Sequence, residues 1–301
     1  MNATVTLSPS QLDAGAPVAP GPIKIGGDEH KRLFCRTLLT TFDPYKPAVI
    51  DWPELEPDAR ERLTSLPIWN IAVQTEGKAG LRVASYGEEV SDPVLKRAIE
   101  LNAFEERRHK SVLHNMVQAY GIKLEPEPAH LKPRDAEWAF LVTGYSECID
   151  SFFAFGLFET AKRSGFFPPA LVDTFEPVMR EEGRHILFFV NWVAWYRRNM
   201  PLWRRPWFAA KIVAVWAFLI WERIGLAKDV AGAPAQDNNF TVNGAKELGI
   251  DISVAALMDV CLSENDRRLG VYDERLLRPN FVPRMVRLAR RFMRAPKREA
   301  A

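Results

Sequence analysis

The segment Glu105-Glu106-Arg107-Arg108-His109 occurs a second time, 76 positions later, as Glu181-Glu182-Gly183-Arg184-His185. Both copies read Glu-Glu-x-Arg-His, and both lie in long stretches that favour helix. Residues three apart on a helix project from one face, so each copy places its second glutamate beside its histidine. A carboxylate and an imidazole on each of two helices are hard to explain by packing alone. The repeat therefore indicates half of a two-metal site.

Helical periodicity on both sides of the repeat predicts an all-α fold. Four long helices are expected at about 66–90, 93–120, 135–163 and 168–199. Ser91-Asp92-Pro93 gives a start signal for the second, Gly121 ends it, and Asp135 can cap the third. Pro177 is expected to kink or split the fourth helix ahead of the second motif.

Two further glutamates occupy the same level as the repeat if these helices pack as an antiparallel bundle. The stretch from Glu76 to Val90, where the first helix ends, is almost as long as the stretch from Pro93 to Glu106. Both glutamates are then about 20 Å from the turn, at 1.5 Å per residue. In the second hairpin the stretch from Glu147 to Ser164 is slightly longer than that from Pro169 to Glu182. Four carboxylates and two imidazoles at one level suit two iron or manganese ions.

This set resembles the ligands of the ferritin-like di-iron carboxylate superfamily, in its oxygenase and oxidase branch: one Glu from each of two helices and Glu-x-x-His from the other two. The similarity covers about residues 66–199. It implies that the metals are held by Glu76, Glu106, His109, Glu147, Glu182 and His185. The expected cofactor is a pair of iron ions, although a manganese–iron or dimanganese centre suits the same ligands.

Four residues of the repeat are candidates for a supporting role. Glu105 and Glu181 each precede a ligand glutamate, and in relatives of this kind a nearby acid often holds a ligand histidine through its free ring nitrogen. A solvated or salt-bridged glutamate is the alternative. Arg108 and Arg184 either neutralise these acids or lie on the outer face. His30, His114 and His130 have no partners at the same level and are interpreted as structural or exposed.

The resemblance implies an O2-dependent oxidoreductase, such as a monooxygenase, that acts on a small and largely apolar organic substrate. Electrons would come from a ferredoxin or a flavin reductase. The alternative is a ferroxidase or storage protein without an organic substrate. About a hundred residues beyond the bundle favour the enzyme, as a monomer or homodimer, because a closed shell would have to accommodate them. Phe152, Phe153, Phe155 and Phe158 either line an apolar chamber or belong to the plain core.

Three regions are expected along the chain: a disordered tail at 1–27, the bundle at 28–200, and a C-terminal extension at 201–301. The bundle region begins with a leading helix near 30–41, followed by an extended, proline-containing connection. The extension carries expected helices at about 206–226, 252–269 and 282–293, and a polar loop at 232–243. The last helix is basic and partly amphipathic. We favour an ordinary packed helix with a solvated basic face, the alternative being contact with an anionic membrane surface or an acidic electron-transfer partner.

Composition narrows the class of protein further. The 301 residues are 47% apolar and 26% charged, with a net charge of +2, which is typical of a globular protein and gives no argument for nucleic acid. The sequence contains no stretch of about 20 apolar residues, so no transmembrane segment is predicted. Cys35, Cys148 and Cys261 are widely spaced and odd in number, which fits a reducing, cytoplasmic compartment.

Overall fold

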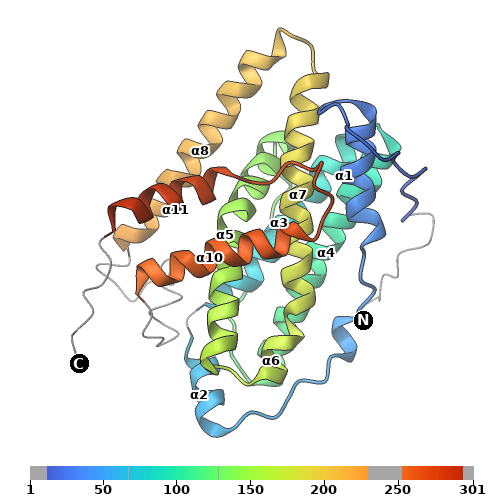
Figure 1. The fold of residues 1–301 in the computed structure, drawn as a ribbon. Helices are drawn as coiled ribbons and strands as arrows, with labels where there is room; N and C mark the ends of the chain where they lie inside the picture. Colours follow the sequence, from blue (N-terminus) through green and yellow to red (C-terminus); the bar gives the residue numbers. More distant parts are fainter. Residues whose placement is uncertain (1–11, 67, 128, 230–252, 294–301) are drawn as a thin grey trace.

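The computed structural model describes residues 12–66, 68–127, 129–229 and 253–293 (Figure 1). Every regular element within these ranges is a helix, which confirms the expected all-α class. The elements are α1 (Asp28–Thr40), the short 3-10 helix η1 (Pro47–Val49), α2 (Pro57–Ser65), α3 (Trp69–Glu89), α4 (Pro93–Ala119), α5 (Ala136–Ser164), α6 (Pro169–Thr174), α7 (Glu176–Asn199), α8 (Arg204–Asp229), α10 (Val254–Gly270) and α11 (Phe281–Phe292).

The long helices begin and end where local signals direct them. The Asp92 side chain accepts hydrogen bonds from the backbone N–H groups of Val94 and Leu95 at the start of α4. Asp135 accepts one from Trp138 N, at 2.8 Å, at the start of α5. Gly121 and Gly165 follow these two helices with φ of 72° and 66°, the left-handed conformation that favours glycine.

The fourth expected helix is split, as Pro177 predicts. Helix α6 ends at Thr174, and α7 begins at Glu176 with Pro177 in its first turn. A proline at that place loses no intrahelical hydrogen bond, because the first N–H groups of a helix have no partner in it. The second motif therefore lies on a helix of its own, α7.

Helices α3, α4, α5 and α7 lie alongside one another in Figure 1. Helix α3 packs on α4 and α5, and α7 packs on α5 and α4, while α1 lies against both α4 and α7. A Cβ atom added at Gly144 of α5 would lie 2.2 Å from the Phe189 ring of α7, so the glycine permits this close approach of the two helices. The packing brings the two Glu-Glu-x-Arg-His segments and their partner helices together.

Residues 12–27 differ from the disordered tail that their composition favours. Ala14 is buried in the core, and three distant arginines donate hydrogen bonds to backbone carbonyls of this segment. These bonds join Arg97 to Asp13, Arg36 to Gly15 and Arg275 to Ala19, at 2.8–3.0 Å. Guanidinium donors from elsewhere in the fold order a segment whose own side chains give no sign of it. The segment after α1, expected to be extended, likewise contains η1 and α2.

The C-terminal helices cover the outer side of α5. Helix α8 packs on α5, α10 packs on α5 and α7, and α11 packs on α10 and α5. A Cβ atom at Gly156 would lie 2.3 Å from the Cys261 Sγ atom, so α10 approaches α5 closely there. The expected polar loop at 232–243 lies outside the described residues. Among the helices of the described residues, none is both long enough and apolar enough to cross a membrane.

Candidate metal centre

The structure brings together all six predicted ligand positions. Helix α3 contributes Glu76, α4 contributes Glu106 and His109, α5 contributes Glu147, and α7 contributes Glu182 and His185. Their ligand atoms form two groups, and within each group the atoms lie within 4.8 Å of one another. One group is Glu76, Glu106, His109 and Glu182, and the other is Glu106, Glu147 and His185. Glu106 belongs to both, so the two groups adjoin.

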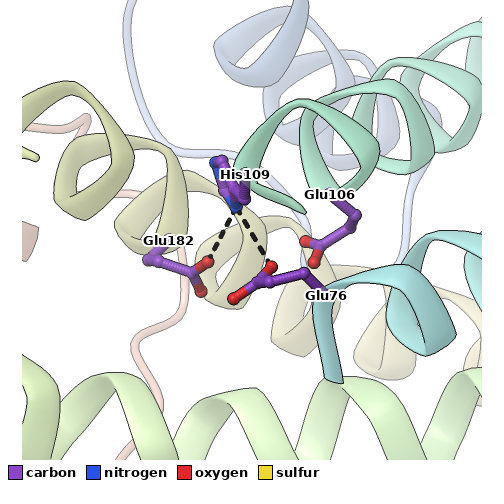
Figure 2. A group of neighbouring side chains, drawn as sticks. All are labelled: Glu76, Glu106, His109 and Glu182. Carbon is purple, nitrogen blue, oxygen red and sulfur yellow. Dashed lines mark ion pairs between the residues drawn. The ribbon is translucent and has the colours of Figure 1, made fainter. Parts of the chain in front are cut away.

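Within each group the ligand atoms face one another, and Figure 2 shows the group of Glu76, Glu106, His109 and Glu182. The His109 Nδ1 atom lies 3.2 Å from Glu182 Oε1 and 3.5 Å from Glu76 Oε2. The His185 Nδ1 atom lies 2.7 Å from Glu106 Oε1. The two imidazole rings are 5.6 Å apart between centroids. Each histidine therefore directs the same ring nitrogen, Nδ1, towards carboxylate oxygens.

Several of these converging atoms lack hydrogen-bond partners. Among the described residues, His109 Nδ1, His185 Nδ1, Glu106 Oε1 and Glu147 Oε1 are buried without a hydrogen bond. A buried polar atom left unpaired costs about 1–3 kcal/mol, so four at one place need an explanation. Nitrogen and oxygen ligand atoms that converge on one another in this way, with His185 Nδ1 only 2.7 Å from Glu106 Oε1, are the arrangement that a cation stabilises. The donor set fits a pair of metal ions.

The other ring nitrogen of each histidine is held by a glutamate from the opposite helix. His109, on α4, contacts the Glu181 carboxylate of α7 through Nε2 at 2.8 Å. His185, on α7, contacts the Glu105 carboxylate of α4 through Nε2, also at 2.8 Å. A carboxylate accepts a hydrogen bond from Nε2–H, which leaves the Nδ1 lone pair free for a metal. Each acid thus contacts the histidine of the opposite copy of the motif, and its supporting role stays a prediction.

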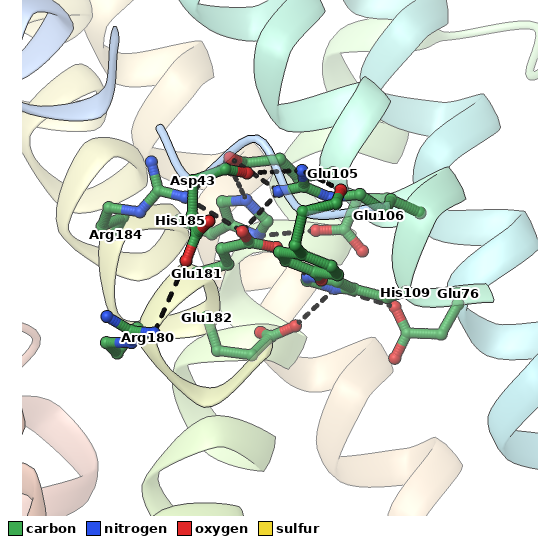
Figure 3. Close-up of polar contacts among 12 residues, drawn as sticks. Asp43, Glu76, Glu105, Glu106, His109, Arg180, Glu181, Glu182, Arg184 and His185 are labelled. Atoms are coloured by element: carbon green, nitrogen blue, oxygen red, sulfur yellow. Dashed lines mark hydrogen bonds and ion pairs between the residues drawn. The ribbon is translucent and has the colours of Figure 1, made fainter. Parts of the chain in front are cut away.

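The two arginines of the repeat neutralise these acids, which decides between the two interpretations of them. Arg184 donates to Glu105 Oε1 at 2.6 Å, and Arg108 donates to Glu181 Oε1 (Figure 3). Each arginine also lies 3.5 Å from the other glutamate. All four side chains are at most 3% exposed. They form a closed cluster, the outer quartet, with two negative and two positive charges.

The outer quartet also ties the site to the chain before it. Arg184 donates a hydrogen bond to Leu38 O at 3.0 Å, near the end of α1. Arg108 donates to Asp43 O at 2.6 Å and to Tyr45 O at 3.2 Å, in the segment after α1. The C-terminal carbonyls of a helix lack intrahelical partners, so the Arg184 contact also satisfies one of them.

The pKa of Glu105 in the outer quartet is shifted in the opposite direction from the pKa values of Glu76 and Glu147 among the inner ligands, whereas for the inner Glu182 burial is outweighed by the contact with His109, which lowers the pKa. Burial would raise the pKa of Glu105, but Arg184 and His185 outweigh it and hold that pKa at about 2. Burial, with the neighbouring charges of Glu106 and Glu182, raises the pKa of Glu76 to about 8. Burial and the same two neighbours raise the pKa of Glu147 well above its ordinary value. The quartet balances its own charge, and two divalent ions would balance the four inner carboxylates if all four are ionised.

Three of the four ligand carboxylates are partly accessible. The Glu76 and Glu182 side chains are 23% and 13% exposed and Glu147 is also partly exposed, whereas the side chains of His109, His185 and Glu106 are at most 2% exposed. A small molecule that reaches the centre therefore meets the Glu76, Glu147 and Glu182 carboxylates before either histidine.

Two residues in contact with the site were not among the predicted ones. Tyr45 donates its hydroxyl to Glu181 Oε2 at 3.2 Å, and Ser151 donates to Glu182 Oε2 at 3.1 Å. Ser151 lies one helical turn after Glu147, so helical spacing could have placed it on the ligand face. Tyr45 lies in a proline-rich connection without any periodicity, and no local signal places it.

The phenylalanines and the other histidines considered in the sequence pack against neighbouring helices, contact polar groups or lie at the surface. Phe152 and Phe153 pack with Cys261 and Val286 of the C-terminal helices, which supports the core interpretation for this pair. Arg268 stacks over the Phe155 and Phe158 rings at 5.3 and 5.4 Å. His30 is buried with Nε2 at 2.8 Å from Asn191 Oδ1. His130 contacts Glu127 at the surface, and His114 is exposed.

The crossed pairing predicts which ion each acid supports. Replacing Glu181 with Gln is expected to weaken binding at the His109 position by about 10- to 100-fold, because the carboxylate that fixes that imidazole is lost. Glu105→Gln is expected to do the same at the His185 position. Titration of the metal-free protein with cobalt(II), followed by visible absorption, would show one weakened step in each variant. Glu127→Gln, at the surface, is the control, and unchanged affinity in both variants would contradict the supporting role.

Comparison of the chain with protein-family models, with curated proteins and with solved structures finds no match.

Proposed function

We propose that this chain is a non-haem di-iron oxidoreductase that uses dioxygen to oxidise a small organic substrate, built on a ferritin-like four-helix bundle of α3, α4, α5 and α7. One observation carries the proposal: carboxylates and imidazole Nδ1 atoms from these four helices converge, and several of them have no hydrogen-bond partner. Mixed carboxylate and imidazole ligands of this kind suit iron or manganese.

The two groups of ligand atoms indicate which residues would hold each ion. Glu76 and His109 would hold one ion, and Glu147 and His185 the other. Glu106 belongs to both groups and would bridge the ions, and Glu182, beside His109, would complete the set. Ser151, hydrogen-bonded to Glu182 Oε2, would limit the positions that this carboxylate adopts.

Bound di-iron centres supply the reduction of dioxygen and the oxidation of an organic molecule. The residues of this chain would direct both molecules to the Glu76, Glu147 and Glu182 carboxylates, where the accessible surface lies. Ala72 and Val178 lie one turn before Glu76 and Glu182 on the same helix faces, so part of the approach is bordered by apolar side chains. This supports a largely apolar substrate. The buried outer quartet keeps both imidazoles oriented and water away from their Nε2 atoms.

Electron delivery and compartment follow from the same proposal. A di-iron centre that reduces dioxygen needs electrons from outside the chain, for which a ferredoxin or a flavin reductase is the suitable class of donor. Cys35, Cys148 and Cys261 are buried free thiols, which supports a reducing compartment such as the cytoplasm. The C-terminal helices that cover α5 support an enzyme over a storage shell, since a shell would have to accommodate them.

The proposal predicts oxygen consumption that depends on an organic molecule. Protein loaded anaerobically with iron(II) is mixed with oxygenated buffer containing candidate lipids, aldehydes, amines or amino acids. We expect faster oxygen uptake with one class of candidate, and a product whose mass shift under 18O2 identifies the reaction. Oxygen uptake without any organic product, together with a ferric mineral core and a large shell by light scattering, would instead establish storage.

A further inference from the structure

Helix α11 carries an apolar ridge on the side that faces solvent. The buried residues of this helix are Pro283 and Val286, and Val286 packs with Phe152 and Cys261. A different face carries large apolar side chains that are 46–81% exposed, at the spacing i, i+4, i+7 and i+11. These are Phe281, Met285, Leu288 and Phe292. A helix of a globular protein normally buries its apolar stripe, so this orientation needs an explanation.

Helix α8 and the turn before it repeat the pattern on a larger scale. Phe208, Val215 and Leu219 are buried on one face of the helix. The opposite face is exposed and wholly apolar over most of its length. It is formed by Trp203, Pro206, Trp207, Ala210, Val213, Ala214, Ala217, Ile220 and Trp221. The tryptophans of this face and two of its aliphatic residues are more than half exposed.

The two helices that carry the exposed stripes lie on the same side of the bundle (Figure 1). Helices α8 and α11 both pack on α5, and the Trp216 and Phe281 rings are 4.6 Å apart between centroids, so the helices are neighbours (Figure 1). In each helix the exposed stripe lies away from the face that is buried on the protein. Together the stripes form one surface, called here the α8–α11 face.

The charges beside the α8–α11 face are positive. Helix α11 contains four arginines and no acidic residue. Arg290 pairs with Asp259 and Arg287 with Asp266, whereas Arg284 and Arg291 form no ion pair among the described residues. In the first turns of α8, Arg205 forms no ion pair among the described residues, whereas Arg204 pairs with Glu137 and Lys211 pairs with Asp135 and Glu137 at the start of α5.

We propose that the α8–α11 face docks on an anionic phospholipid bilayer, with the apolar ridge and the tryptophans in the interfacial layer and the arginines on lipid phosphates. Exposed Trp, Phe and Leu beside a row of Arg is the composition of helices that lie in the plane of a membrane surface. The proposal rests on this surface alone and not on the chemistry of the metal centre.

Charge favours lipid over a second copy of the chain. An interface between two copies related by a two-fold axis would place the same basic helices opposite each other, and like charges across an interface oppose association. Anionic headgroups instead complement the arginines, and the acyl boundary accepts the apolar ridge. One surface chemistry then accounts for both the apolar and the basic residues.

The test is flotation of the full-length protein with vesicles of phosphatidylglycerol and phosphatidylcholine, against vesicles of phosphatidylcholine alone. We expect binding to the anionic vesicles that weakens with added sodium chloride. Neutralising Arg284 and Arg291 to Gln should weaken it about fivefold for each arginine. Leu288→Ser and Phe292→Ser should each weaken it by about tenfold, because an apolar side chain no longer enters the interface.

Two exposed residues away from the α8–α11 face serve as matched controls. Leu131, which is 86% exposed, is replaced by Ser, and the exposed Lys123 by Gln. Neither change should alter vesicle binding. The proposal is overturned if the protein does not float with anionic vesicles, or if it binds neutral vesicles equally well. It is also overturned if light scattering shows a dimer that Leu288→Ser and Phe292→Ser dissociate while vesicle binding is absent.

Discussion

Replacing both His109 and His185 with Ala is expected to lower the metal content from about two ions per chain to well below one. The six candidate ligand residues offer only two nitrogen ligand atoms, and each histidine supplies one of them to its own group. Without them the carboxylates would have to hold two cations with oxygen and water alone. Emission spectroscopy of the protein after anaerobic iron(II) loading and dialysis measures the ratio of metal to protein.

Other histidines of the chain supply the control for this experiment. His114→Ala and His130→Ala remove imidazoles that lie away from the site, and both variants should keep two ions. Alanine also removes the partners of Glu105 and Glu181, so His109→Gln and His185→Gln, which retain an N–H group, separate loss of ligand from loss of fold. Circular dichroism confirms the helical content of every variant. Retention of both ions in the double alanine variant would rule out the ligand assignment.

The convergence of the six candidate ligands could be predicted because the number of residues along a helix determines the height of a side chain in the bundle. Glu76 and Glu106 lie at nearly equal distances from the turn that joins their helices, and the repeated motif marks the level on the other hairpin. Proline and capping residues fixed the ends of these helices closely enough for that count to hold. The count needs only the rise per residue and antiparallel neighbours, both of which are local properties.

The crossed pairing could not be predicted in the same way. Glu105 precedes Glu106 by one residue, which places it about 100° further around α4, on no face that periodicity singles out. Whether it reaches its own histidine or His185 depends on how α4 is rotated relative to α7. That rotation is set by packing, for example by the packing of α1 against both α4 and α7, and local sequence does not encode it.

Contacts from irregular segments were missed for a related reason. Tyr45 reaches Glu181 across 136 positions, and Arg275 reaches Ala19 across 256. Neither segment has a hydrophobic period, and composition favoured an extended connection in one case and disorder in the other. Long-range hydrogen bonds determine where such segments lie. These bonds depend on the fold that the helices have already formed, so local sequence does not reveal them.

Arg184→Met is expected to lower the free energy of unfolding of the metal-free protein by about 3–5 kcal/mol, the usual cost of removing one partner from a buried charge pair. Glu105 would remain fully buried, with its closest cation lost and Arg108 at 3.5 Å. Urea unfolding at pH 7, followed by circular dichroism in the presence of a chelator, measures the change. Arg180→Met is the control, because Arg180 is 58% exposed beside Asp43, and a surface pair contributes at most about 1 kcal/mol.

A double variant and the pH dependence show whether charge is the cause. Glu105→Gln with Arg184→Met removes one charge of each sign and should recover most of the lost stability, because Arg108 and Glu181 still balance each other. In the wild type the pKa of Glu105 is lowered from 4.5 to about 2. The stability that this shift contributes is present above pH 4.5 and is lost as the pH falls towards 2. Arg184→Met should remove most of that dependence. A loss no larger than that of Arg180→Met, with the same pH profile as the wild type, would show that the outer quartet orients the histidines without stabilising the fold.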